Sequence, residues 1–226
     1  MMVKKCKIIF ALDFSQRKDF SYWLDLTEDL IDFYKIGLVA FTGLGVEAIK
    51  IVKRRKKRIF LDLKFFDIPN TMIKSTMNLL PLGIDMLDFH LLADKDSLQF
   101  TLEEIRRLAK NKIDLPYFLG VTILTSSSFK FTIHKKVSTL VDKAFELGFE
   151  GVVLPGREAE QIRKKVGEDF LLVCPGIRVN ENNDDQKMTV TVKDIKEIAD
   201  YIVVGRPIYQ AKEPCKVINE ILKEIG

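Results

Sequence analysis

The stretch Arg58-Ile-Phe-Leu-Asp-Leu-Lys-Phe-Phe-Asp-Ile-Pro-Asn-Thr71 decides the fold of this chain. Its first half predicts a strand buried on both faces, as in a parallel sheet, because bulky apolar residues surround the charges. Asp62 and Lys64 are two residues apart, so both side chains point to the same face of an extended strand. Charges inside such a strand are costly to bury unless they pair or do chemistry.

The second half of the stretch turns the chain into a helix. Pro69 fits the first turn of that helix, which places Asp67 at the junction between strand and helix. Functional groups of parallel α/β folds collect at such junctions. A structural ion pair at the strand end is the alternative interpretation, and a third charge at the turn weakens it.

Segments of strand type and helix type alternate along the rest of the chain. The predicted strands are Cys6–Asp13, Phe33–Leu38, the opening stretch, Met86–Leu92, Tyr117–Leu124, Gly151–Pro155, Phe170–Cys174 and Tyr201–Gly205. The predicted helices are Ser15–Leu30, a helix after Gly43 that ends in Lys53–Arg58, Thr71–Leu80, Ser97–Ala109, a helix through Phe145, Glu158–Val166 and Cys215–Ile225.

Eight such units with no linker-like break predict the α/β class and one (β/α)₈ barrel domain, a TIM barrel, over residues 1–226. A doubly wound open sheet is the alternative fold. The count of eight, and the absence of a Gly-x-Gly-x-x-Gly turn after the first strand, argue against the open sheet.

Composition favours a cytoplasmic enzyme. The chain is 47% hydrophobic and 30% charged, which is ordinary for a globular protein, and its net charge of +4 does not by itself imply nucleic acid. The odd number of widely spaced cysteines indicates reduced thiols, and the two histidines have no metal-ligand spacing. The apolar run Ile8–Leu12 is too short for a signal peptide or membrane span.

Two polar segments need separate interpretation. The basic run Lys53–Arg58 is interpreted as a solvated helix C-terminus on the face opposite the barrel's active site, rather than a nucleic-acid patch. Residues 178–187 form the longest polar stretch without a regular pattern, which is typical of a lid or binding loop. A plain surface loop is the alternative.

Active sites of such barrels lie at the C-terminal ends of the strands. A helix cap would explain Asp13 alone, and a side chain reaching out to solvent would explain Lys35 alone. Together with the opening stretch they place two lysines and three carboxylates around one mouth. The residues expected there are Asp13, Lys35, Asp62, Lys64, Asp67, His90, Thr122–Ser126, Pro155, Pro175–Arg178, Gly205 and Arg206.

The end of the eighth strand predicts a phosphate site. In Val203-Val-Gly-Arg-Pro207, Gly205 allows backbone N–H groups to approach an anion, and Arg206 offers a forked donor. Loops after strands seven and eight are the usual phosphate site of these barrels. A phosphorylated substrate is therefore expected, and Gln186 is placed to close over its phosphate.

These residues resemble the orotidine 5′-phosphate decarboxylase family. Asp62-x-Lys-x-x-Asp-Ile-Pro-Asn-Thr71 looks like its signature, and the resemblance covers nearly the whole chain. The other matching stretches, in the family's order, are Ala11-Leu-Asp13, Tyr34-Lys-Ile-Gly37, Val121-Thr-x-Leu-Thr-Ser126, Pro175-Gly-Ile-Arg178, Asp184-Asp-Gln186 and Val204-Gly-Arg-Pro-Ile208.

The resemblance implies conversion of orotidine 5′-monophosphate to uridine 5′-monophosphate and CO₂, the last step of de novo pyrimidine synthesis, with no cofactor and no metal. Lys64 would stabilise and protonate C6, Asp62 and Asp67 would hold its ammonium, and Lys35 would complete an alternating charge row. The expected substrate contacts are Asp13, Lys35 and Thr71 at the ribose, Thr125 and Ser126 near the pyrimidine, Gln186, Gly205, Arg206 and Arg178 at the phosphate, and Ile68 and Pro175.

The resemblance also implies a homodimer in which Asp67, Ile68 and Thr71 reach into the partner's site, with no nucleic-acid or membrane partner. The chain departs from the family at Leu91–Asp96, at Met188, and in lacking the usual proline before Ala199. Two other functions stay open. One is a Mg²⁺-dependent 3-keto-gulonate-phosphate decarboxylase or hexulose-phosphate synthase, although those relatives typically carry an acidic residue in place of Lys35. The other is an idle barrel that binds a nucleotide or nucleic acid.

Overall fold

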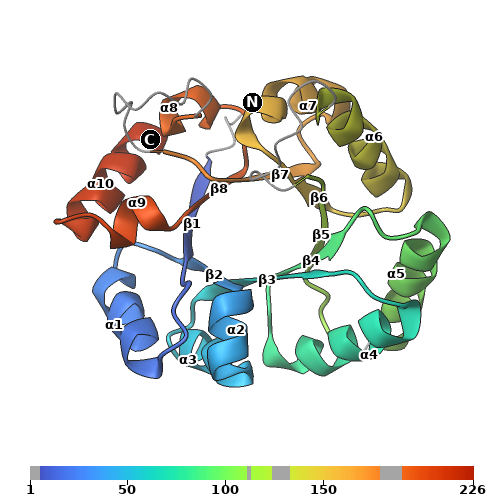
Figure 1. Ribbon diagram of the computed structural model, residues 1–226, viewed down its shortest axis with the longest axis horizontal. Helices are drawn as coiled ribbons and strands as arrows, with labels where there is room; N and C mark the ends of the chain where they lie inside the picture. Colours follow the sequence, from blue (N-terminus) through green and yellow to red (C-terminus); the bar gives the residue numbers. More distant parts are fainter. Residues whose placement is uncertain (1–5, 111–112, 124–132, 179–189) are drawn as a thin grey trace.

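The computed structural model describes residues 6–110, 113–123, 133–178 and 190–226. Over these residues eight parallel strands form a closed barrel in chain order, and β1 pairs with both β2 and β8 (Figure 1). The predicted (β/α)₈ fold is confirmed, because an open sheet has no pairing between its first and last strands. The strands are β1 Lys7–Ala11, β2 Phe33–Gly37, β3 Arg58–Phe65, β4 Met86–His90, β5 Tyr117–Val121, β6 Gly151–Val153, β7 Leu171–Pro175 and β8 Tyr201–Val204.

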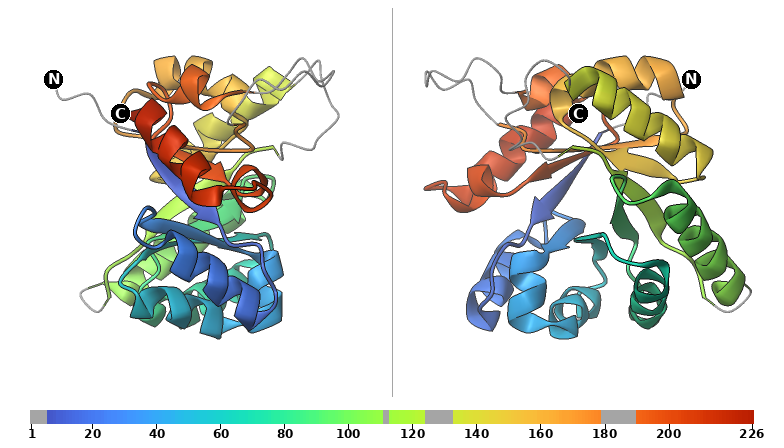
Figure 2. Two further views of the ribbon diagram at one scale, coloured as in Figure 1. Left: turned by 90° about the vertical axis from the view of Figure 1, so that its left-hand side faces the viewer. Right: turned by 45° about the vertical axis from the view of Figure 1, so that its right-hand side comes forward.

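Helices lie outside the strands in every view (Figures 1 and 2). None of the helices in the described ranges is long and apolar enough to span a membrane. They are α1 Arg17–Thr27, α2 Leu38–Leu44, α3 Val46–Arg54, α4 Pro69–Leu79, α5 Lys95–Ala109, α6 Ile133–Glu146, α7 Ala159–Val166, α8 Val192–Ile195, α9 Arg206–Tyr209 and α10 Pro214–Ile225, with short 3₁₀ turns η1 Leu80–Leu82 and η2 Gly156–Glu158.

Strand residues alternate between two apolar environments, as a period of two requires. On β3, Phe60 belongs to the cluster inside the barrel, whereas Ile59 and Leu61 belong to the larger cluster that includes the helices. Each fully buried side chain of this size contributes about 1.5–3 kcal/mol to folding. The inward positions one step further along β2 and β3 are Lys35 and Asp62, so the same alternation brings charged side chains to the mouth.

The main difference from the predicted elements lies between β2 and α3. The predicted helix after Gly43 corresponds to α3, but another helix, α2, begins at Leu38, where the sequence predicts strand. Gly45 separates the two helices with φ +58°, a left-handed conformation that a side chain would strain. The apolar residues of α2 continue the apolar run of β2, which is why the sequence pattern conceals the boundary.

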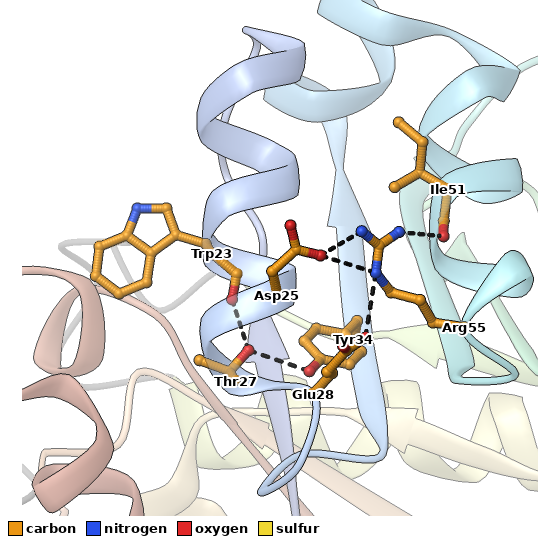
Figure 3. Close-up of polar contacts among 7 residues, drawn as sticks. All are labelled: Trp23, Asp25, Thr27, Glu28, Tyr34, Ile51 and Arg55. Atoms are coloured by element: carbon orange, nitrogen blue, oxygen red, sulfur yellow. Dashed lines mark hydrogen bonds and ion pairs between the residues drawn. The ribbon is translucent and has the colours of Figure 1, made fainter.

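Four of the six residues of the basic run Lys53–Arg58 form ion pairs, and these are Lys53, Arg54, Arg55 and Arg58. Arg55 Nε lies 3.0 Å from Asp25 Oδ1 and 3.1 Å from Glu28 Oε2, and an Arg55 Nη donates to the carbonyl of Ile51 at 3.2 Å (Figure 3). In the same way Lys53 pairs with Asp85, Arg54 with Glu47 and Arg58 with Asp32. These contacts join α1, α3 and neighbouring loops, and they support a structural role for the run.

Candidate active site

Four charged side chains form a row at the carboxyl ends of β1, β2 and β3. Lys35 Nζ lies 3.1 Å from Asp13 Oδ1 and 3.2 Å from Asp62 Oδ2. The other oxygen of Asp62 pairs with Lys64 Nζ. The row therefore alternates anion, cation, anion and cation. The predicted pairing of Asp62 with Lys64 on one face of β3 is present in the structure.

The interior of the row is desolvated, and its outer members reach solvent. The side chains of Asp62 and Lys35 are 11% and 12% exposed, against 30% for Lys64 and 34% for Asp13. Burial alone would raise the pKa of Asp62, but the charge of Lys35, the neighbouring Asp88 carboxyl and the charge of Lys64 lower this pKa to about 2. Burial lowers the pKa of Lys35, and the charges of Asp62 and Asp13 outweigh this effect and raise it. Both inner members are thus held in their charged forms.

The backbone of β3 is irregular where it carries these charges. Leu61 pairs with Leu87 and Phe65 with Phe89, so the register between β3 and β4 shifts across Lys64. Lys64 has φ +50°, which a residue with a side chain seldom adopts, and its N–H donates to Asp88 Oδ1 at 2.7 Å. Sequence reasoning missed Asp88. The available signal was a lone acidic residue inside the apolar strand Met86–His90.

Two neighbouring cavities extend from the row across the barrel mouth. The smaller, about 220 Å³, contains Lys35, Asp62 and Lys64 in its lining. The larger, about 680 Å³, lies over β7 and β8. Lys35, Pro175 and Val203 line both cavities, so they form one elongated space with the charge row at one end. Other predicted residues that line the larger cavity are Asp13, Arg178, Gly205 and Arg206.

The loop after β8 matches the predicted anion site in its location. Gly205 precedes α9, and a Cβ built on it would lie 3.2 Å from the Cβ of Ala11 and 3.4 Å from the ring of Tyr209. A side chain here would therefore crowd the wall of the larger cavity. Arg206 is exposed at the first turn of α9, and Arg178 is half-buried across the cavity after β7. The larger cavity thus has two guanidinium groups among its lining residues.

The turn after β3 does not complete the row within this chain. The Asp67 carboxylate accepts a hydrogen bond from the N–H of Ile68 at 2.7 Å, and the structure records no ion pair between the described residues Asp67 and Lys64. Ile68 is 64% exposed, and Thr71 is also exposed. Three other predicted site residues, Thr125, Ser126 and Gln186, lie outside the described residues, as does Met188.

The atypical segment Leu91–Asp96 is firmly anchored. Leu91 is fully buried, and its methyl groups fill the space above Gly120, where an added Cβ would lie 2.8 Å away. Lys143 donates to the carbonyls of Leu91, at 2.9 Å, and Ala93. Asp94 caps α5 by accepting from the N–H of Ser97 at 3.0 Å. The residues that depart from the family pattern are therefore held by specific packing and hydrogen bonds in this chain.

His90, the last residue of β4, lies next to the turn after β3. Its ring stacks on Phe66 with centroids 5.7 Å apart, and burial together with the charge of Lys64 lowers its pKa. Within the described residues, no cluster of three or more His, Cys, Asp or Glu side chains is arranged to hold a metal ion.

The closed barrel, the charge row and the guanidinium-lined cavity at the carboxyl ends of the strands define an enzyme of the (β/α)₈-barrel class. Residues 6–221 match the model of the orotidine 5′-phosphate decarboxylase / HUMPS family, and the chain belongs to this family.

Individual relatives agree with this assignment. The chain is 37% identical to an orotidine 5′-phosphate decarboxylase of Pelobacter propionicus, over 97% of this chain and 95% of that protein. It is 34% identical to an enzyme of the same name from Legionella pneumophila strain Lens, over 97% and 99%. The crystal structure of orotidine 5′-phosphate decarboxylase from Lactobacillus acidophilus superposes with a TM-score of 0.79 at 30% identity, covering 98% of this chain and 99% of that one.

Proposed function

We propose that this chain, as one barrel domain over residues 1–226, converts orotidine 5′-monophosphate to uridine 5′-monophosphate and CO₂ in pyrimidine biosynthesis, without a cofactor. The observation that carries the proposal is the alternating row from Asp13 to Lys64, whose cationic end lies in the smaller cavity. The identity of the substrate is inferred from the relatives, which are named orotidine 5′-phosphate decarboxylase. The direct test is a spectrophotometric assay that follows loss of the orotate chromophore, and an unchanged spectrum would contradict the proposal.

The chemical difficulty of this reaction is a carbanion left at C6 of the pyrimidine with no obvious electron sink. A preorganised cation stabilises such charge without reorganisation, and Lys64 is the cation that borders the smaller cavity. In our proposal its ammonium stabilises the carbanion and then gives C6 a proton. Asp62 accepts from that ammonium and stays ionised between two lysines, so it also repels the substrate carboxylate that leaves as CO₂.

The rest of the elongated space would hold the nucleotide. Lys35 lines both cavities and Asp13 lines the larger one, and the ribose would bind beside them; the phosphate would lie near Gly205, Arg206 and Arg178. Pro175 lines both cavities and would contact the bound nucleotide. We further propose that Thr125 and Ser126 contact the pyrimidine and that Gln186 joins the phosphate site.

We also propose a homodimer in which Asp67, Ile68 and Thr71 of one subunit complete the partner's site. The exposed apolar side chains near the turn after β3 support it. Phe66 is 61% exposed, Ile68 64% and Leu92 62%. A second copy of the chain would cover this apolar surface and bring Asp67 toward the partner's Lys64.

Arg206→Ala is expected to reduce kcat/KM for orotidine 5′-monophosphate about 30- to 150-fold, mostly through KM, since loss of one charge-assisted forked contact costs about 2–3 kcal/mol. Free guanidinium should restore part of the loss. The sharper comparison uses orotidine, which lacks the phosphate, because Arg206→Ala should leave turnover of the nucleoside unchanged. Arg17→Ala, on exposed α1, is the matched control. Equal losses with both substrates would place the phosphate elsewhere.

The family name also includes HUMPS. The competing function is the Mg²⁺-dependent reaction on a sugar phosphate that the sequence analysis left open. Lysines pair with the carboxylates of the row, so Asp13 and Asp62 are already neutralised without a divalent cation. Activity on orotidine 5′-monophosphate is therefore expected to survive exhaustive EDTA treatment and to need no added Mg²⁺. Activity lost on chelation and restored by Mg²⁺ would instead favour the sugar-phosphate relatives.

A further inference from the structure

Asp88 faces the irregular part of β3. Since Leu61 pairs with Leu87 and Phe65 with Phe89, residues 62–64 of β3 lie opposite the single residue Asp88 of β4. A bulge of this kind leaves backbone groups that the regular strand ladder cannot pair. On its other side Asp88 is in register with Leu119 of β5, which is apolar.

The Asp88 side chain replaces the missing strand partner. Its Oδ1 accepts from the N–H of Lys64 at 2.7 Å, while Lys64 has φ +50°. A residue with a side chain seldom adopts this conformation and needs surrounding structure to hold it there. Asp88 is fully buried. Its carboxyl therefore fixes the direction in which the Lys64 side chain leaves the strand.

The second oxygen of Asp88 requires a different explanation. Oδ2 is buried and accepts no hydrogen bond from any described residue. The charged groups near Asp88 are Asp62 and Lys64 on β3, and Lys35 on β2 pairs with Asp62. The titratable group nearest to Asp88 along β4 is His90, two residues further on. Burial, and then the charge of Asp62, raise the pKa of Asp88 well above its ordinary value. A proton on Oδ2 removes the charge and provides a donor toward Asp62.

We propose that Asp88 is a positioning residue for the charge row: its neutral carboxyl donates to Asp62 and accepts from the backbone N–H of Lys64. It lines neither cavity of the site, so it acts through these two residues rather than on the substrate. The catalytic part of this inference rests on the proposed function. The protonation of Asp88 and its contact with Lys64 do not.

Two substitutions of Asp88 distinguish a neutral carboxyl group from an ionised one at this position. In Asp88→Asn the amide oxygen can accept from Lys64 and the amide N–H can donate to Asp62, with no ionisation. This variant is expected to keep kcat within about threefold of wild type, whereas Asp88→Leu, which removes both hydrogen bonds, should lose about 100-fold in kcat with little change in KM. A loss in Asp88→Asn as large as in Asp88→Leu, or no loss in either, would overturn the proposal.

Stability as a function of pH tests the proton without any assay of activity. Asp in the unfolded chain ionises near pH 4, while Asp88 keeps its proton to higher pH in the folded state. Wild type therefore loses stability relative to Asp88→Asn as pH rises above about 4. The melting temperature of Asp88→Asn minus that of wild type should grow between pH 4 and pH 7. A constant difference, or one that shrinks, would show an ionised Asp88.

Infrared spectroscopy provides a direct readout that also serves if the leucine variant fails to fold. Wild type at pH 7 should show the carbonyl band of a protonated carboxylic acid, and Asp88→Asn should lack it. Asp85→Asn is the matched control, because Asp85 likewise accepts from a backbone N–H, that of Ile59 at 2.8 Å, but pairs with Lys53 at 3.3 Å. If no such band is present, or if only Asp85→Asn removes it, the proposal fails whichever substrate the enzyme uses.

Discussion

Lys64→Ala is expected to lose at least about 10⁴-fold in kcat, because the substitution removes both a preorganised cation and a proton donor, effects of about 10²–10³ and 10²–10⁴. Folding should persist, since the side chain is 30% exposed and Asp62 retains its pair with Lys35 at 3.2 Å. Turnover is followed with orotidine 5′-monophosphate. Binding of uridine 5′-monophosphate, measured by calorimetry, should stay within a few-fold of wild type, because the proposed phosphate site at Gly205 and Arg206 lies in the larger cavity, which Lys64 does not line.

Two further variants sharpen this test. Lys50→Ala, on the exposed face of α3, removes a lysine of the same kind far from the mouth and should behave as wild type. Lys64→Arg keeps a positive charge but does not release a proton readily. Its activity relative to Lys64→Ala therefore separates carbanion stabilisation from proton donation. Near-normal turnover in Lys64→Ala would exclude Lys64 as the proton donor.

The barrel was predictable because a period of two and an alternation of element types are local properties of the sequence. The spacing of Asp62 and Lys64 predicts their common face, and the structure pairs them. Their contact also depends on a register shift and on the left-handed backbone of Lys64, neither of which local periodicity encodes. The sequence pattern therefore identified the two residues of the pair but not the register shift or the backbone conformation that bring them into contact.

Asp88 was missed for a related reason. Its importance depends on which residues of β3 lie opposite it, and strand register is set by side-chain packing across the whole barrel. The same limit applies to α2, whose apolar residues are as compatible with an extension of β2 as with a helix. Single-strand patterns predict which residues point inward, but contacts between strands decide what those residues do.

The turn after β3 leads to the second large effect, which depends on two subunits. In this chain Asp67 bonds to the N–H of its neighbour Ile68, and among the described residues no ion pair joins Asp67 to Lys64. Lys64→Ala and Asp67→Ala should each be nearly inactive alone if Asp67 completes the partner's site. When the two variants exchange subunits, one site of each mixed dimer receives both lesions and the other receives neither. Random exchange makes about half of the dimers mixed, so roughly a quarter of full activity should return, as two-fold symmetry requires.

The matched control for this experiment exchanges Lys64→Ala with Asp62→Ala. Asp62 contacts Lys64 within one chain, so in that mixed dimer each site still carries one lesion and no activity should return. Subunit exchange must be confirmed separately, for instance by energy transfer between labelled subunits. Recovery with Asp67→Ala but not with Asp62→Ala would show that the turn after β3 serves the neighbouring subunit. If exchange is complete and neither mixture regains activity, Asp67 acts within its own chain, and the exposed apolar side chains beside it require another explanation.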